Sequence, residues 1–193
     1  AHPGTWPGIG RFVYLSDARF LPKGETGLHP HQEIDVISAM VEGRVVHGGS
    51  LEDGRELAAF DVQVQRGGGE GFEHNEINPD DRESRMIQMW ALPERPGEPA
   101  GYKAYRPDWG ATTRVYGGPS EQTDTFAGGT QIHVALLRRG GAVSAPGEFM
   151  AYIVSGRGEV AGTVVSEGDM LRGGGLDFRA DSDVLLIWVH TLP

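Results

Sequence analysis

The sequence has no cysteine among its 193 residues. Disulfide bonds, thiol nucleophiles and cysteine-based zinc or iron–sulfur sites are therefore excluded. Basic charge is also scarce, because 17 Lys and Arg stand against 27 Asp and Glu, which leaves a formal net charge of −10. No basic run interrupts this acidic balance. We therefore expect neither nucleic acid nor an anionic membrane as a direct partner.

Long hydrophobic runs are missing too. The longest apolar stretch, Val184–Val189, has the length of a strand, whereas a membrane-spanning helix needs about 18 apolar residues. The first residues, Ala1–Trp6, show no basic and then apolar leader, which favours a cytoplasmic protein. Hydrophobic residues still make up 38% of the chain, which is enough to build a core and argues against disorder.

What the chain has in abundance is turn residues, with 30 Gly and 12 Pro. Between the turn signals lie short runs of β-type composition, and no amphipathic pattern is longer than two helical turns. Many short strands at hairpin spacing are typical of a sandwich or barrel, so we expect an all-β fold. The expected strands are Arg11–Leu15, Ile34–Val41, Gly43–His47, Phe60–Gln65, Ser84–Leu92, Thr130–Leu137, Met150–Val154 and Val184–His190.

A weak internal repeat indicates two similar halves. Met40–Arg44 resembles Ile153–Arg157, and the four residues that begin at Arg66 are identical to the four that begin at Arg172. Two matches in the same order favour a duplicated β-barrel. We expect an N-terminal barrel over residues 1–95, a connector over residues 96–129 with one short helix or strand, and a C-terminal barrel over residues 130–193.

Histidines carry the strongest local signal. His29 and His31 flank a proline, and His74 and Glu76 repeat the same i, i+2 spacing. On an extended chain such residues point to the same face, and the proline favours extended geometry at His29. A single His-x-His is usually a surface feature. If both pairs lie on neighbouring strands, however, three imidazoles and one carboxylate converge, a donor set that suits Fe(II), Mn, Ni, Cu or Zn.

These residues also carry a family resemblance. The segment 29–43 resembles the first cupin motif of pirin-like proteins, and the segment 69–76 resembles their second motif, Gly-x-Gly-x-x-His-x-Glu. Near the C-terminus, segments 154–156 and 167–169 are similar to the second barrel of the same proteins. The resemblance implies a bicupin, in which two antiparallel β-barrels of jelly-roll type share one chain.

The resemblance also implies a site and a cofactor. The N-terminal barrel would hold one divalent metal ion through His29, His31, His74 and Glu76. Fe(II) is the expected ion, and Ni, Mn, Cu, Co or Zn are alternatives. The C-terminal barrel would hold none, because the repeat places Ala142, Ser144, Ala180 and Ser182 at the equivalent positions.

Two functions remain open at this point. Some pirin-like proteins resemble quercetin 2,3-dioxygenases, which cleave the central ring of a flavonol with O2 and release CO. We then expect a dioxygenase acting on quercetin or a related flavonol or enediol aromatic, with Glu76 as catalytic proton acceptor and with unassigned substrate-binding residues. The alternative is a non-catalytic, redox-sensing regulatory or small-molecule-binding cupin with a protein partner. An isomerase using the same metal is a third, weaker possibility.

The other polar features are expected to be structural. His47 is expected at the surface or in a hairpin, with lining of the site as the alternative. His133 and His190 are expected to be structural or to face solvent. The acidic segment 80–83 is expected to be a solvated hairpin tip.

Overall fold

Residues 8–191 are described by the computed structural model, and every regular element among them is a β-strand, which confirms the all-β expectation. Since this part of the chain holds no helix, it has none long and apolar enough to cross a membrane. The strands are β1 (Phe12–Phe20), β2 (His29–His31), β3 (Asp35–Glu42), β4 (Arg44–Gly49), β5 (Arg55–Ala58), β6 (Val62–Arg66), β7 (Phe72–Ile77), β8 (Ser84–Ala91), β9 (Gly101–Tyr105), β10 (Ala111–Gly118), β11 (Gly128–Leu137), β12 (Ala142–Ser155), β13 (Arg157–Val160), β14 (Thr163–Ser166), β15 (Met170–Ala180) and β16 (Val184–Thr191).

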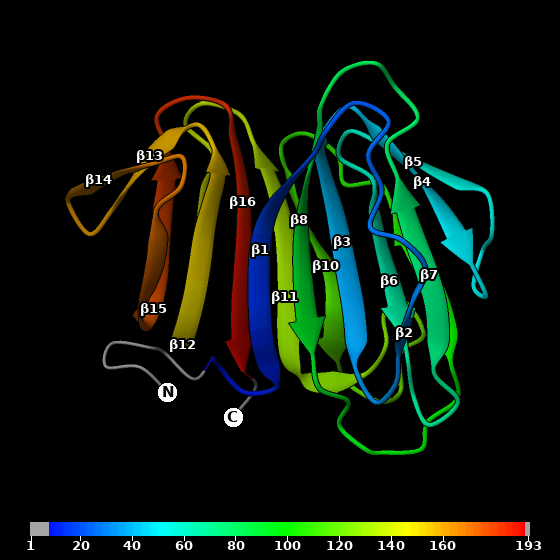
Figure 1. Cartoon of the computed structure of the whole chain (residues 1–193). Helices are drawn as coiled ribbons and strands as arrows, with labels where there is room; N and C mark the ends of the chain where they lie inside the picture. The colour runs from blue at the N-terminus through cyan, green and yellow to red at the C-terminus, as the bar shows by residue number, and fades with distance from the viewer. Residues whose placement is uncertain (1–7, 192–193) are drawn as a thin grey trace, which may run out of the picture.

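The strands form three antiparallel sheets. A five-stranded sheet has the order β1-β8-β3-β6-β9, and a four-stranded sheet has the order β2-β7-β4-β5. The third sheet has seven strands in the order β10-β11-β16-β12-β15-β13-β14. Figure 1 shows the two N-terminal sheets on one side of the molecule and the C-terminal strands on the other, with β1 and β16 near the middle. This is the two-unit β architecture that the resemblance to bicupins implies.

The central strands β3, β6 and β8 are buried on both faces. Because successive side chains of a strand alternate between faces, each strand serves two interiors. One face, which includes Ile37, Val64 and Met89, packs against the seven-stranded sheet in the largest hydrophobic cluster. The other face looks towards the four-stranded sheet and carries polar side chains, among them Gln63 and Gln88, into the N-terminal interior.

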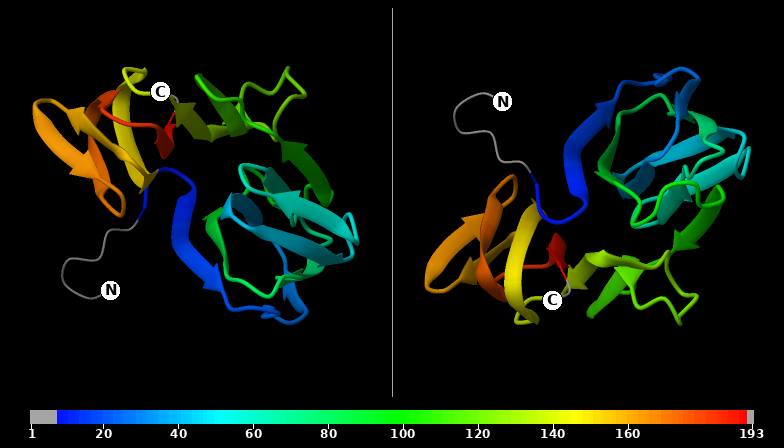
Figure 2. Two further views of the ribbon diagram at one scale, coloured as in Figure 1. Left: turned by 90° about the horizontal axis from the view of Figure 1, so that it is seen from above. Right: turned by 90° about the horizontal axis from the view of Figure 1, so that it is seen from below.

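The C-terminal sheet curls around a core of its own. Phe149 of β12, Val165 of β14, Phe178 of β15 and Leu186 of β16 belong to one buried cluster. Seen along the strands, the C-terminal strands bend into a second unit beside the N-terminal strands, which surround a common interior (Figure 2). The two units therefore share one large core between their sheets and keep separate interiors.

The segment 96–129 holds more structure than the one short helix or strand expected from its composition. Both β9 and β10 lie there; β9 completes the five-stranded sheet and β10 begins the seven-stranded one. Strand β9 also reaches the N-terminal interior, because the Tyr102 hydroxyl donates a hydrogen bond to Oε1 of Gln63 (3.2 Å). The high Pro, Gly and polar content of this segment concealed two edge strands.

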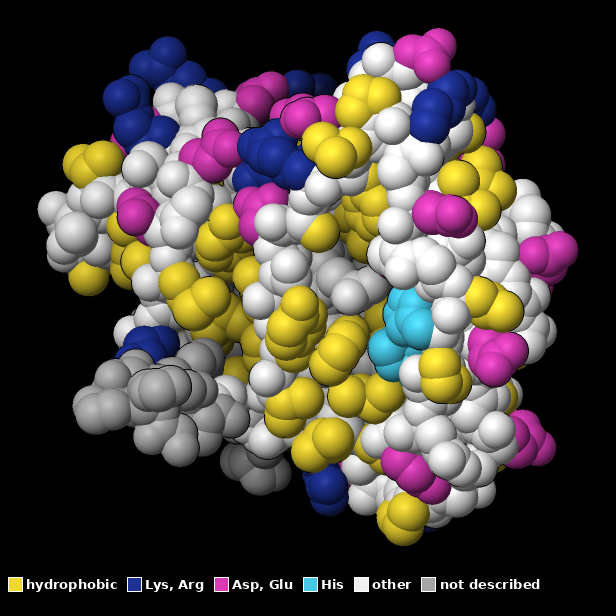
Figure 3. Space-filling model, in the orientation of Figure 1, with side chains coloured by type: hydrophobic (Ala, Val, Ile, Leu, Met, Phe, Trp, Pro, Cys, Tyr) yellow, Lys and Arg dark blue, Asp and Glu magenta, His cyan; other side chains and the backbone are white. Residues whose placement is uncertain are grey.

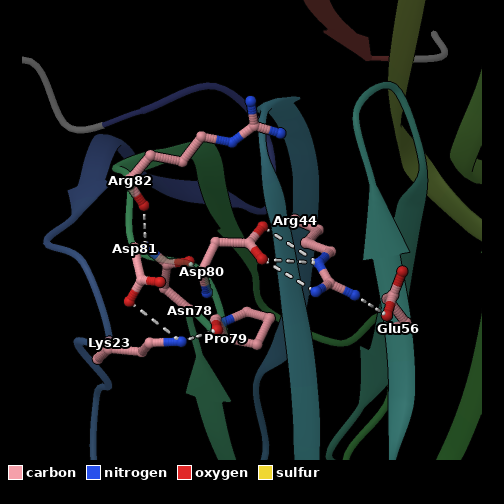
Figure 4. Close-up of polar contacts among 8 residues, drawn as sticks. All are labelled: Lys23, Arg44, Glu56, Asn78, Pro79, Asp80, Asp81 and Arg82. Atoms are coloured by element: carbon pink, nitrogen blue, oxygen red, sulfur yellow. Dashed lines mark hydrogen bonds and ion pairs between the residues drawn. The ribbon is translucent and has the colours of Figure 1, made fainter.

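The acidic tip between β7 and β8 is anchored to the four-stranded sheet (Figure 4). Arg44 of β4 donates hydrogen bonds to both carboxylate oxygens of Asp80 (2.9–3.2 Å) and to Glu56 of β5 (2.7 Å). The Arg44 guanidinium beside Asp80 holds the pKa of that carboxyl below its usual range. Buried Asn78 closes the turn by donating to the carbonyl of Arg82 (2.7 Å). The expectation of a merely solvated tip is therefore wrong for Asp80.

Candidate metal centre

Strand pairing brings the predicted histidines together. Strand β2 pairs antiparallel with β7, so that His29 lies opposite His74, and His31 shares the face of His29. On its other side β7 pairs with β4, where Gly49 lies opposite His74. Gly49 has φ +135°, and a Cβ atom there would stand 2.0 Å from the carbonyl oxygen of Glu73. Only glycine allows β4 to approach the histidine strand this closely.

The three imidazoles converge on one point. The Nε2 atom of His74 lies 3.0 Å from Nε2 of His29 and 3.1 Å from Nε2 of His31. Among residues 8–191, these three side chains form a group whose ligand atoms all lie within 4.8 Å of one another. His74 is fully buried, whereas His29 and His31 are partly buried.

Hydrogen bonds at the far side of two rings define their tautomers. Nδ1 of His29 lies 2.8 Å from the carbonyl oxygen of Gly27, which can only accept, so Nδ1 carries the proton. Nδ1 of His74 lies 2.9 Å from Oε1 of Gln65 and donates in the same way. In a neutral imidazole the other nitrogen then has no proton. Nε2 of His74 therefore presents a lone pair to the centre, and Nε2 of His29 does the same when its ring is neutral.

A bound cation would remove the repulsion between the facing Nε2 atoms. Two unprotonated Nε2 atoms 3.0 Å apart, as in His29 and His74, cannot form a hydrogen bond and repel each other. Burial and the neighbouring imidazoles lower the pKa of His74 to about 3 and that of His31 to about 4, so these two rings are neutral at neutral pH. Neutral imidazoles whose lone pairs face one point are the donor set of a divalent transition metal. The residues present therefore fit a metal ion.

Glu76 lies in the same interior, two residues after His74, but its carboxylate is not part of the three-histidine group. Its Oε1 accepts hydrogen bonds from Ser38 (2.9 Å) and Gln63 (3.4 Å), and its Oε2 accepts one from Gln88 (2.9 Å). The side chain is fully buried. Burial raises the pKa of Glu76 to about 7, although the three hydrogen bonds favour the ionised form.

Two contributors to this interior were missed or misplaced by the sequence analysis. His47 is fully buried and its ring centroid lies 5.7 Å from that of His74, so the surface expectation is wrong and the alternative of lining the site holds. Gln65 of β6 bridges the two rings, with Nε2 at 2.9 Å from His47 and Oε1 at 2.9 Å from His74. The signal that the sequence offered was the alternation of two valines with Gln63 and Gln65, which places both glutamines on one face of a strand.

An aromatic pair borders the centre. The indole of Trp90 lies edge-on to His31, with ring centroids 5.6 Å apart, and its other neighbour Tyr14 stacks against it at 4.4 Å. Tyr14 is 39% exposed, so this pair reaches the surface. In the space-filling view, histidine side chains are visible at the surface beside a group of hydrophobic side chains (Figure 3). Trp90 and Tyr14 thus form an apolar wall beside His31.

The two C-terminal histidines are structural, as expected. His133 stacks on Trp188 with ring centroids 4.0 Å apart, and Nε2 of both His133 and His190 lies within 3.3 Å of Oε1 of Gln131.

Fold and centre together define a class of protein, namely an all-β protein of cupin type with a three-histidine centre in its N-terminal unit. More specifically, residues 12–91 match the family model named Pirin. The matched segment includes all four residues of the expected ligand set, and the match confirms the resemblance noted from the motifs.

Relatives and solved structures agree with this assignment. A quercetin 2,3-dioxygenase of Escherichia coli is 31% identical over 83 residues, which cover 42% of this chain and 36% of the relative. A Mycobacterium tuberculosis protein provisionally named as the same enzyme is 27% identical over 94% of this chain and 80% of its own. The E. coli protein YhhW has a fold with a TM-score of 0.83 at 21% identity, covering 97% of this chain and 83% of that chain. The matched part of this chain spans about a third of the first curated relatives, between 32% and 37% of their length.

Proposed function

We propose that this chain is a metal-dependent, pirin-like dioxygenase that opens the central ring of quercetin or a related flavonol with O2. The observation that carries the proposal is the centre itself, in which imidazole lone pairs face one another beside a buried carboxylate. The relatives named as quercetin 2,3-dioxygenases support the choice of reaction. We propose the cytoplasm as its location, which cell fractionation would test.

One Fe(II) ion per chain is the cofactor we propose, held by His29, His31 and His74, with Glu76 as a fourth ligand. Nickel, manganese, copper, cobalt and zinc suit the same nitrogen and oxygen donors. A solved structure of bacterial pirin YhhW from E. coli is a nickel(II) complex, which supports nickel as a probe ion for this chain. When bound, the metal supplies the Lewis acidity that lowers the pKa of a flavonol hydroxyl and the redox chemistry for reaction with O2.

Glu76 is the residue we propose to take the hydroxyl proton. Burial raises the pKa of Glu76 to about 7 in the metal-free protein, which makes it a stronger base than an ordinary glutamate. Hydrogen bonds from Ser38, Gln63 and Gln88 hold its carboxylate on the inner face of the sheets. Proton transfer requires an approach to about 3 Å between the carboxylate and the hydroxyl oxygen.

Substrate class follows from the wall beside the centre. Trp90 and Tyr14 present aromatic surface next to His31, and no charged side chain takes part in that stack. Aromatic rings prefer offset or edge-on contact with one another, so a planar flavonol can lie against this pair while its oxygens reach the centre. A strongly charged substrate would gain little binding free energy from contact with these two aromatic rings.

The test is O2 uptake by the Fe(II)-loaded protein with quercetin, next to a His31→Ala variant. We expect metal-dependent uptake with release of CO, and loss of both in the variant because one of the three facing nitrogens is gone. Absence of uptake by protein that binds one equivalent of metal would overturn the dioxygenase proposal. It would favour a metal-dependent regulatory or binding role instead.

A further inference from the structure

A hydrogen-bond chain connects the hairpin between β4 and β5 with the metal-facing nitrogen of His74. It begins at the carbonyl oxygen of Glu52, which lies 3.2 Å from Nδ1 of His47. Nε2 of His47 lies 2.9 Å from the amide nitrogen of Gln65, and the amide oxygen of Gln65 lies 2.9 Å from Nδ1 of His74. His47, Gln65 and His74 are all fully buried.

The chain can have only one polarity. A main-chain carbonyl only accepts, so Nδ1 of His47 must donate to Glu52, and Nε2 of a neutral His47 must then accept. The Gln65 amide has to turn its NH2 group to His47, which leaves its oxygen to accept from Nδ1 of His74. Each link determines the next, and the last one leaves Nε2 of His74 without a proton.

The start of the chain is held by a strained residue. Glu52 has φ +56°, a left-handed conformation that costs free energy in any residue other than glycine. Its carbonyl also accepts from the backbone N–H of Arg55 (3.1 Å), while Gly54 donates to the carbonyl of His47 (2.8 Å). The turn thus points one carbonyl towards the ring of His47 and holds the backbone of that residue.

We propose that His47 and Gln65 are positioning residues that set the tautomer of His74 and thereby prepare its Nε2 for a metal ion. The inference rests on the proposed metal centre for its purpose, although the tautomer itself is a property of the metal-free protein. Groups that orient ligand histidines in this way commonly alter metal affinity 10- to 100-fold when they are removed. Neither residue has to contact metal or substrate.

The experiment measures ring protonation and metal binding separately. Long-range ¹H–¹⁵N correlation spectra of the metal-free, ¹⁵N-labelled protein report which nitrogen of each histidine carries a proton. In the unaltered protein we expect His47 and His74 both protonated on Nδ1 alone. A proton on Nε2 of either ring at neutral pH overturns the proposal, and this outcome needs no variant.

Substitutions then test the transmission from one ring to the other. His47→Leu removes the acceptor for the Gln65 amide, which is then free to turn, so we expect a mixture of both His74 tautomers and at least tenfold weaker Ni(II) binding by calorimetry. His47→Gln can accept and donate at similar positions, and it should restore the Nδ1-protonated form. His133→Leu is the matched control, because His133 also contacts a buried glutamine but lies in the other unit.

Two further results test the positioning role of His47 and Gln65. Gln65→Glu should keep His74 protonated on Nδ1 and place a second proton on His47, since a carboxylate accepts from both rings. An unchanged His74 tautomer in His47→Leu, with Ni(II) affinity within twofold of the unaltered protein, would refute the positioning role. Failure of Ni(II) to bind the unaltered protein would instead count against the proposed function and leave the tautomer result standing.

Discussion

At the scale of single residues, the proposed reaction depends on Glu76, a carboxylate that accepts hydrogen bonds from three side chains. The Glu76→Gln substitution keeps the size of the side chain and one oxygen that can ligate a metal, but it removes the negative charge that makes the side chain a base. We expect the Glu76→Gln variant to keep part of its metal and to lose about 10²- to 10⁴-fold in kcat, the usual contribution of a general base. Metal content by emission spectroscopy and quercetin loss by absorbance measure the two effects, and full turnover in this variant excludes the base role.

The pH profile distinguishes a base from a purely structural carboxylate. Glu76 has to be ionised to accept a proton, so kcat/KM of the metal-loaded protein should fall towards acid pH. The fall should lie below the pKa of about 7 that burial gives the metal-free carboxyl, because a bound cation favours the ionised form. The pH profile of the Glu76→Gln variant should lack this acidic limb, the fall in kcat/KM towards low pH. Ser38→Ala serves as the control, because it removes one donor to Glu76 and should shift the limb to higher pH without abolishing it.

At the scale of elements, one arginine ties strands of both units together. Arg85 of β8 donates to both carboxylate oxygens of Asp17 on β1 (2.6 and 2.8 Å), to Glu167 beyond β14 (2.9 Å) and to the carbonyl of Val154 on β12 (2.9 Å). Its side chain is 4% exposed. The Arg85 guanidinium keeps the pKa of Asp17 below its usual range, as expected of a strong pair.

Loss of this arginine should loosen the contact between β8 and β12. The Arg85→Met variant leaves Asp17 with Tyr152 as its remaining donor and leaves the Val154 carbonyl without this partner. We expect a loss of about 3 kcal/mol in the free energy of unfolding, measured by urea denaturation. The Arg85→Lys variant keeps the charge but not the forked geometry, so its free energy of unfolding should lie between those of the unaltered protein and of Arg85→Met. Equal midpoints for all three proteins would contradict a role in stability.

Elements also show where sequence reasoning succeeds. Strands such as β3, β8 and β16 were predicted because they are largely apolar runs of strand length between turn residues, which is the pattern of strands buried on both faces. Strand β9 was missed, because it lies at a sheet edge and contains few apolar residues. The histidine pairs were predicted from spacing, but the partnership of His47 with Gln65 was not, because it depends on which strands become neighbours.

At the scale of the whole molecule, the two units meet through a largely apolar core that also contains one acid. Asp35 of β3 is 1% exposed and accepts a hydrogen bond from the Tyr116 hydroxyl of β10 (2.7 Å). Burial raises the pKa of Asp35 from an ordinary 3.8 to about 6, although the hydrogen bond opposes this change. The folded protein therefore binds more protons than the unfolded chain between about pH 4 and pH 6.

This difference gives the association of the two units a predictable pH dependence. Because the folded state holds the extra proton, the Asp35 contribution is most favourable below about pH 4, declines up to about pH 6 and is constant above it, with a total of at most about 3 kcal/mol. The Asp35→Asn variant keeps an acceptor for Tyr116 and cannot ionise. Urea denaturation should find it more stable than the unaltered protein by about 2 kcal/mol at pH 7, and equally stable near pH 4. A constant difference between the two proteins across this range would show that Asp35 does not titrate in the folded state, and that the contact between the units does not depend on its charge.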